Sequence, residues 1–144
     1  MNWHVFGLKR LFETHRMKKI CTLLTLVILL GSFTFNSHKG IEDIVTALKN
    51  GNANQVASYF DNTVEITLPQ KSNTYSKSQA EMIIRDFFSN NAIRSFNVIH
   101  KGENAGSQYC IGTLITKSAQ FRTTVFMKQK GDRQTLQEIR FENR

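Results

Sequence analysis

The fold is decided by residues 41–68, which read IEDIVTALKNGNANQVASYFDNTVEITL. The first apolar residues recur at the i, i+3, i+4, i+7 spacing of one helix face, namely Ile41, Ile44, Val45 and Leu48. Gly51 then takes the left-handed position that ends a helix, and Asn52 can cap a second helix with Gln55 three residues later. We therefore expect two short amphipathic helices that are separated at Gly51.

Beyond the second helix the apolar period changes from helical to alternating. Asp61 and Asn62 close the helix, and from Thr63 apolar and polar residues alternate until Pro69. Val64, Ile66 and Leu68 share one side, and Glu65 and Thr67 share the other. This pattern predicts a half-buried strand, followed by an exposed turn or short hairpin at residues 70–74.

The rest of the chain indicates one more helix and then only strands. A capping box precedes this helix, formed by Ser76 with Gln79 or by Ser78 with Glu81. Its apolar stripe has helical spacing and consists of Ala80, Ile83, Ile84, Phe87 and Phe88. Three or four strands are expected after it, at residues 93–101, 108–117, 120–130 and 134–142.

No crossover helix separates these later strands, so we expect them to pair as an antiparallel meander. A curved sheet needs cover on one face, and helices that each carry one apolar stripe supply it. The sequence thus predicts an α+β fold in which three N-terminal helices pack on a curved antiparallel sheet, as a cone-shaped roll. Gly112, inside a strand, predicts a bulge or a strong bend of the sheet.

Residues 17–37 have the layout of a secretory signal peptide. A basic start at Met17, Lys18 and Lys19 precedes an apolar core at residues 20–30 and then small residues. The core is shorter than the roughly 20 residues of a transmembrane helix, so the chain meets the membrane only if this segment stays uncleaved. We expect an exported protein, periplasmic or extracellular. Residues 1–16 then form an extended n-region or follow an unused start, and residues 38–144 form one domain.

Composition argues against several classes of function. The formal net charge of +8 falls to +4 without residues 1–37, which carry five basic residues and one acidic residue. The remaining Lys and Arg are interleaved with Asp and Glu and form no basic stripe, which argues against nucleic-acid binding. The His and Cys residues lack metal-ligand spacing, so we expect no metal and no other cofactor. Cys110 is the only cysteine after residue 37 and has no disulfide partner.

The order helix, helix, strand, helix and strand meander resembles the nuclear transport factor 2-like superfamily, whose members share a cystatin-like α+β roll. Residues 48–60, LKNGNANQVASYF, look like that superfamily's passage from the first to the second helix. Residues 75–80, YSKSQA, resemble its entry to the third helix. The chain is most similar to uncharacterised small secreted bacterial members. The resemblance implies a cone in which enzymes place an Asp, Glu or His, although the same fold hosts binding and interaction domains.

Tyr59, Asp61 and His100 are the candidates for catalysis, and together with Tyr109 they are the candidates for ligand binding. Tyr59 and Asp61 end the second helix near the mouth that the resemblance implies, so we expect the phenol and the carboxylate to lie close together. A strand His can act as a general base or bind a ligand. If the turn occupies residues 104–106, His100 faces Cys110 as a base beside a nucleophile. A slip of one residue places it opposite Tyr109.

Three functions are compatible with these features. The leading hypothesis is a non-catalytic domain that binds a small apolar or amphipathic ligand, or a protein partner. One alternative is a small lyase or isomerase with an Asp or His base inside the cone. The other is a structural homodimer through the open sheet face, with Phe126, Phe121 or Ile139 at the interface.

Whether the interior of the cone is open or filled would distinguish these hypotheses. A pocket of more than about 300 Å³ with a buried, unpaired base would favour the enzyme. A cone that is filled by Phe60, Phe87, Phe88 and Phe96 would argue against both hypotheses that need a pocket.

Overall fold

Nine elements follow one another along residues 40–144, the part of the chain that the structure, a computed structural model, describes. They are α2 (Ile41–Lys49), α3 (Ala53–Ser58), β1 (Phe60–Leu68), β2 (Lys71–Ser76), α4 (Lys77–Asn90), β3 (Ile93–Asn104), β4 (Ser107–Thr116), β5 (Gln120–Lys130) and β6 (Arg133–Asn143). The predicted n-region at residues 1–16 and the predicted signal peptide at residues 17–37 lie outside the described residues. Among the described helices, none combines the length and the apolar composition that crossing a membrane requires.

The six strands form one sheet in the order β2-β1-β6-β5-β4-β3. The last four strands pair antiparallel with their neighbours along the chain, as predicted. β1 pairs antiparallel with β2 but parallel with β6, so the prediction of an antiparallel sheet was wrong for this pair. The cause is a crossover: α4 carries the chain from the β2 edge to the β3 edge. Four antiparallel strands then bring β6 back beside β1 in the same direction.

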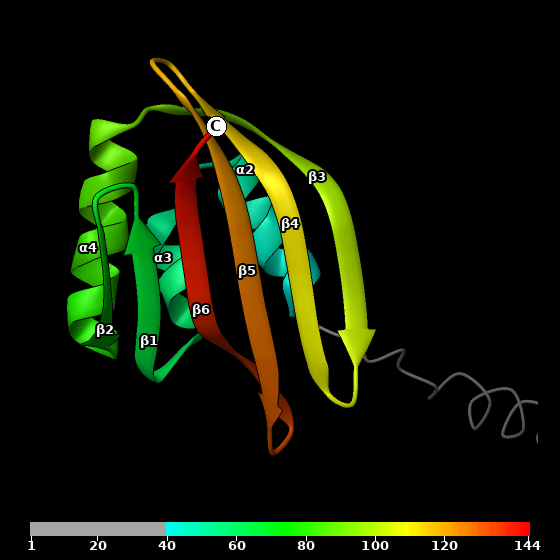
Figure 1. Cartoon of the computed structure of the whole chain (residues 1–144). Helices are drawn as coiled ribbons and strands as arrows, with labels where there is room; N and C mark the ends of the chain where they lie inside the picture. Colours follow the sequence, from blue (N-terminus) through cyan, green and yellow to red (C-terminus); the bar gives the residue numbers. More distant parts are fainter. Residues whose placement is uncertain (1–39) are drawn as a thin grey trace, which may run out of the picture. The chain divides into compact units, whose positions relative to one another are not determined.

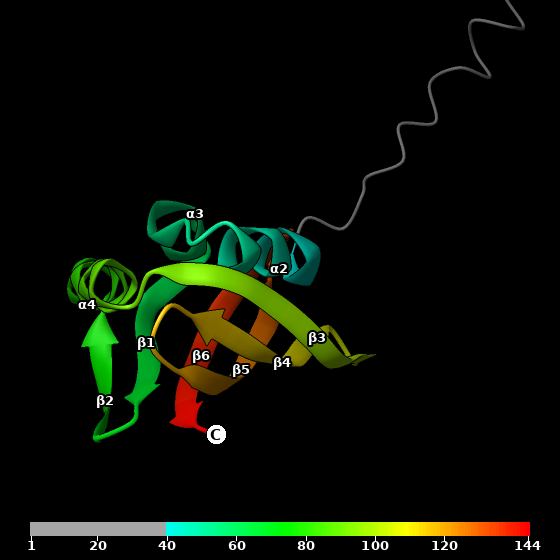
Figure 2. The same ribbon diagram turned by 90° about the horizontal axis from the view of Figure 1, so that it is seen from above.

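The three helices lie on one face of the curved sheet, and the opposite face is uncovered by the described residues (Figure 1, Figure 2). Only α2 and α3 precede the first strand, whereas α4 follows the β1–β2 hairpin. The expected group of three N-terminal helices is therefore interrupted by two strands. Residues 71–76, of which most were expected in a turn or short hairpin, form the edge strand β2.

Local signals set the helix ends largely as predicted. Gly51 has φ +61°, and the side chain of Asn52 accepts a hydrogen bond from the Gln55 N–H at 3.0 Å. Ser76 and Gln79 form the capping box of α4. One boundary differs, because α3 ends at Ser58 and β1 begins at Phe60 rather than at Thr63. Phe60 already pairs with β6, so strand pairing replaces the helix earlier than the local pattern indicates.

The start of α2 is anchored to the sheet by a residue far along the chain. Gly40 offers no side-chain cap, and instead the Oε1 of Gln108 on β4 accepts a hydrogen bond from the Ile41 N–H at 3.2 Å. A Cβ on Gly40 would lie 2.6 Å from this oxygen, so glycine provides the room that the bond needs. The buried amide of Gln108 thereby satisfies one of the unpaired N–H groups of the first helical turn.

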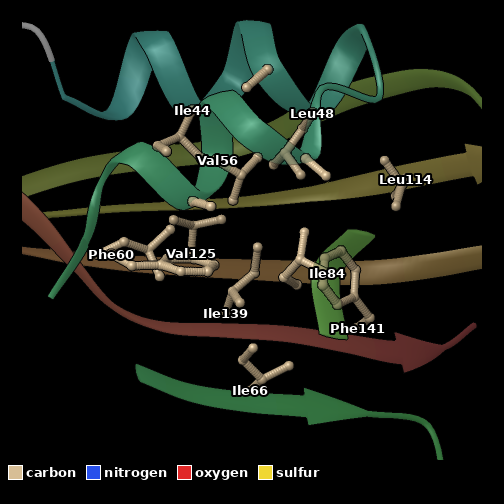
Figure 3. Packing of buried hydrophobic residues seen from close by; sticks show 14 of the residues in the cluster. Ile44, Leu48, Val56, Phe60, Ile66, Ile84, Leu114, Val125, Ile139 and Phe141 are labelled. Atoms are coloured by element: carbon tan, nitrogen blue, oxygen red, sulfur yellow. The ribbon is translucent and has the colours of Figure 1, made fainter. Parts of the chain in front are cut away.

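One apolar core fills the space between the helices and the sheet. Figure 3 shows side chains from α2, α3 and α4 meeting side chains from the sheet. Those labelled are Ile44, Leu48, Val56, Phe60, Ile66, Ile84, Leu114, Val125, Ile139 and Phe141. The ring of Phe87 on α4 lies 4.5 Å from that of Phe141 and 5.3 Å from that of Phe121, measured between centroids. Aromatic contacts of this kind hold α4 against β5 and β6.

The sheet is irregular where Gly112 was expected to mark a bulge or bend. The register of β3 against β4 shifts between Val98 and His100, so that Ile99 is an extra residue opposite Gly112 and Ile111. A Cβ on Gly112 would lie 2.5 Å from the ring of Phe96, which lies across this glycine. The predicted bulge is confirmed, with its extra residue in β3.

The β3–β4 turn contains a backbone conformation that its residue does not favour. Ala105 has φ +46° and Gly106 has φ +79°. In the β5–β6 turn Gly131 has φ +63°, and a Cβ added to it would have no atom within 4 Å.

We predict that Ala105→Gly raises the free energy of unfolding by about 0.5–1 kcal/mol, since Gly adopts this conformation without steric cost. Urea denaturation measures the change.

Gly131→Ala is the matched control for the same effect in the opposite direction. It should lower the free energy of unfolding by about 1 kcal/mol, because the open surroundings leave only the backbone to resist the methyl group. A loss of stability in Ala105→Gly would contradict the turn geometry.

Candidate functional site

The cone that the resemblance implies is filled by side chains. The four phenylalanines that would decide the question, Phe60, Phe87, Phe88 and Phe96, are exposed by 4%, 8%, 7% and 1%. They belong to the same cluster as Leu114, Val125 and Ile139, which are fully buried. This packing argues against both the ligand hypothesis and the enzyme hypothesis that place a pocket there. The residues that could carry a function must therefore be sought on the surface.

Tyr59 directs its phenol toward α2. Its hydroxyl donates a hydrogen bond to the carboxylate of Asp43. Burial, with the hydrogen bond to Asp43 and the charge of that carboxylate, raises the pKa of Tyr59 to about 12. The phenol therefore keeps its proton at neutral pH and can donate but not accept one as a base. Its role in the structure is to join the end of α3 to the first turn of α2.

Asp61 lies in a separate polar cluster at the start of β1. Its carboxylate accepts hydrogen bonds from the Gln137 amide at 2.8 Å and from Lys130 Nζ at 2.9 Å. These bonds, that of Gln137 first, lower the pKa of Asp61 to about 2. Tyr59 and Asp61, which were expected to lie close together, bond to different partners. Because β1 begins at Phe60, which points into the core, Asp61 alternates to the opposite face.

His100 and Tyr109 form a pair on the open face of the sheet. His100 Nε2 and Tyr109 Oη lie 2.8 Å apart, in hydrogen-bonding distance. In the ladder His100 is opposite Ile111, and Tyr109 is opposite Gly102. A Cβ on Gly102 would meet the ring of Tyr109, so the phenol lies across this glycine toward His100. Both candidate residues thus share one surface.

The expected pair of His100 and Cys110 does not form. The β3–β4 turn holds only residues 105 and 106 rather than 104–106, so Asn104 pairs with Ser107, Lys101 faces Cys110 and His100 faces Ile111. Cys110 is fully buried on the helix side, and burial raises the pKa of its thiol to about 11. Lys101 is engaged by Glu42, whose hydrogen bond raises the pKa of the lysine. A protonated, enclosed thiol is a poor nucleophile.

Residues on the open face follow one another in rows across the strands. One row places Tyr109, Phe126, Glu138 and Glu65 side by side on β4, β5, β6 and β1. The next row consists of His100, Ile111, Thr124, Arg140 and Thr67. We call His100, Tyr109, Ile111 and Phe126 the open-face patch. Within the described chain Tyr109, Ile111 and Phe126 are half-buried, and Ile99 beside the patch is 62% exposed.

Two of the residues expected on this face point the other way. Phe121 is 5% exposed and Ile139 is fully buried, both in the core beneath the helices. Only Phe126 of the three expected interface residues reaches the open face. Ile99 and Ile111 were missed by the sequence reasoning. The exposure of Ile99 depends on the bulge, and nothing in the sequence around Ile111 distinguishes it from other strand residues.

Charged residues border the patch. The Arg140 guanidinium pairs with Glu138, while Arg122 and Glu142 are directly opposite each other on β5 and β6. Arg144 donates a hydrogen bond to the hydroxyl of Thr113 at 2.6 Å. Across residues 40–144, no group of three or more His, Cys, Asp or Glu side chains is arranged to hold a metal ion. The open face therefore combines an aromatic and aliphatic centre with a charged surround.

We predict that Asp61 stabilises the fold in a manner that depends on pH. Its pKa is about 2 in the folded chain against an ordinary value of 3.8, so its stabilisation is complete above about pH 5 and is lost as the pH falls through 2. Asp61→Asn should therefore be less stable than the parent chain at pH 6, and the difference should shrink steadily as the pH is lowered to 2 and below. Chemical denaturation at several pH values measures this convergence. A difference that does not change with pH would count against the ionic contacts.

The family comparison identifies one domain family. The model described as "Domain of unknown function (DUF4783)" matches residues 41–142. A comparison with curated proteins gives no match.

Solved structures include several similar chains. A DUF4783 family protein from Bacteroides uniformis is 31% identical, with a TM-score of 0.69 over 72% of this chain and 95% of that one. Another from Bacteroides ovatus is 28% identical, with a TM-score of 0.68 over 71% and 93%. An NTF2-like protein of unknown function from Cytophaga hutchinsonii is 7% identical, with a TM-score of 0.53 over 72% and 86%. This last likeness concerns the fold alone.

Proposed function

The chain belongs to the DUF4783 family of domains of unknown function, and from that premise we propose that it is an exported, non-catalytic domain that binds a protein partner through the open face of its sheet. We propose further that its roll is of the nuclear transport factor 2-like type. The order of the elements and the fold likeness to the Cytophaga hutchinsonii protein support this assignment. The layout of residues 17–37 supports export.

One observation carries the proposal: the cone is filled while the opposite face of the sheet presents an aromatic patch. Tyr109 and Phe126 are cross-strand neighbours, and His100 and Ile111 extend the patch toward the β3 edge. Tyr, Phe and Arg are enriched at the centres of interfaces between proteins, where a few such buried side chains supply much of the binding energy. A polar surround of Arg140, Glu138 and Arg122 matches the rim of such an interface.

The arrangement of the titratable residues supports a role without catalysis. Tyr59, Asp61 and His100 each have their own partner, in three separate places. The raised pKa of Tyr59 and the lowered pKa of Asp61 place both groups far from the values that suit proton transfer at neutral pH. His100 stands on an open surface that would not shield a reacting substrate from water.

Photo-crosslinking in the native cells tests the binding surface. We predict that a benzoylphenylalanine at position 126 crosslinks a defined partner, and that Tyr109→Ala in the same chain removes this product. The matched control carries the same group at position 82, where Met82 is 55% exposed on α4. That position lies on the helix-bearing side and should give no such product. Equal crosslinking from both positions would refute the proposed surface.

A second copy of the chain is the alternative partner, and the charges of the open face favour it. Arg122 on β5 is directly opposite Glu142 on β6. Another row crosses the strands from β4 to β1, with two aromatic residues followed by two acidic ones, in the order Tyr109, Phe126, Glu138 and Glu65. A twofold axis along the strands between β5 and β6 would set Arg122 of one copy over Glu142 of the other. The same axis would set Tyr109 over Glu65. The Arg122–Glu142 pair would thus be matched in charge twice across such an axis, once from each copy.

Charge reversal tests this alternative. If the partner is a second copy, the chain is dimeric at micromolar concentration by size exclusion with light scattering. Arg122→Glu or Glu142→Arg alone should make it monomeric, and the double variant should restore the dimer. A monomeric parent chain would exclude the homodimer and leave a different protein as the partner.

A further inference from the structure

The α2–α3 connection contains the chain's only asparagine that is followed by glycine, Asn50 before Gly51. An asparagine in this setting can lose its side-chain amide in water without an enzyme. The backbone nitrogen of the next residue attacks the side-chain carbonyl carbon, and glycine has no side chain to obstruct the approach. Asn50 is exposed to solvent at the end of α2. The dipeptide is therefore open to a covalent change that involves neither the core nor the open face.

The folded backbone does not present the reacting atoms to each other. The reaction closes a ring of Gly51 N with the C, Cα, Cβ and Cγ atoms of Asn50, so the glycine nitrogen must nearly eclipse Cβ about the Cα–C bond. Asn50 has φ −91° and ψ −2°. This ψ eclipses the glycine nitrogen with the backbone nitrogen of Asn50 instead, about 120° away from Cβ by the tetrahedral geometry of Cα. The attack thus requires a large rotation about ψ.

Hydrogen bonds on both sides of the dipeptide resist this rotation. The Gly51 N–H donates to the Leu48 carbonyl at 3.2 Å. The Asn52 N–H donates to the Ala47 carbonyl at 2.8 Å. The side chain of Asn52 also caps α3, by accepting from the Gln55 N–H at 3.0 Å. The connection must therefore open before the glycine nitrogen can give up its proton and reach Cγ.

We propose that Asn50 is the site at which this domain deamidates, and that opening of the α2–α3 connection controls the rate. A base removes the proton of the Gly51 nitrogen, this nitrogen bonds to Asn50 Cγ, and the side-chain nitrogen leaves as ammonia with a proton from water. Water then opens the resulting succinimide. Cleavage at Cγ yields aspartate, and cleavage at the backbone carbonyl yields isoaspartate. Water replaces ammonia overall, and nothing is oxidised or reduced.

Both products disturb the way in which α2 and α3 cover the sheet. Aspartate adds a negative charge at the C-terminal end of α2, where the helix dipole disfavours it. Isoaspartate adds a methylene to the backbone directly before Gly51, which is held at φ +61° beside Ile93. Leu48 on α2 and Val56 on α3 are fully buried, so a displaced connection disturbs the core that they form. Deamidation thus loosens the fold.

Peptide mapping by mass spectrometry tests both parts of the proposal. The full chain is incubated at mildly alkaline pH, folded and in guanidinium chloride, and the conversion of each asparagine is followed over time. In the unfolded chain we expect Asn50 to convert ahead of Asn62 and Asn104, which are followed by residues with side chains. Folding should slow the conversion of Asn50 about tenfold or more, because opening gives up two hydrogen bonds. Faster conversion of another asparagine, or equal rates in both states, would overturn the proposal.

Substitutions separate control by the connection from an effect of sequence. Asn52→Ala removes the cap of α3 and should speed the reaction about fivefold in the folded chain, with no change in the unfolded chain. Asn54→Ala is the matched control and should react as the parent does, because this side chain bonds to Arg85 and not to the connection. Asn50→Gln should abolish the product, since its longer side chain cannot close the same ring. An unchanged folded rate in Asn52→Ala would show that the connection does not control the reaction.

Discussion

The packing of Phe87 against Phe141 and Phe121 determines what the rest of the molecule can do. These rings, 4.5 Å and 5.3 Å from that of Phe87, hold α4 across the concave side of the sheet and occupy the volume that a cone-shaped roll otherwise leaves open. Removing one buried phenylalanine side chain typically costs about 3–5 kcal/mol. A ligand that entered this space would have to displace several such side chains. The filled state is therefore strongly favoured, and function is directed to the surface.

The open face is the surface that suits a protein partner, because it presents Tyr109 and Phe126 among paired charges. It lies on the side of the sheet that the three described helices do not cover.

Local chemistry made a large part of the fold predictable. Gly51, Asn52 and the pair Ser76 and Gln79 act on residues a few positions away, so their effect on helix ends is visible in the sequence. The parallel pairing of β1 with β6 was not predictable in this way. It joins segments some seventy residues apart, and it depends on the direction in which the meander returns. The anchoring of Ile41 by Gln108 is non-local for the same reason.

The candidate site was predictable only in part, because side-chain direction in a sheet depends on register. The β3–β4 turn has two residues rather than the three expected, and this places His100 on the face of Tyr109 instead of that of Cys110. Tyr59 and Asp61 are two positions apart, yet the change from helix to strand at Phe60 separated their partners. The members of the open-face patch could be identified only from the pairing of residues between neighbouring strands.

The central claim is that side chains fill the interior of the cone. Xenon binding tests this claim most directly, because xenon enters apolar cavities without needing polar contacts. Crystals of the protein under xenon pressure should show no xenon site among Phe87, Phe121 and Phe141. Xenon bound between these rings, or a small molecule retained there from the cell, would show that the cone is open. Either result would return the function to the interior.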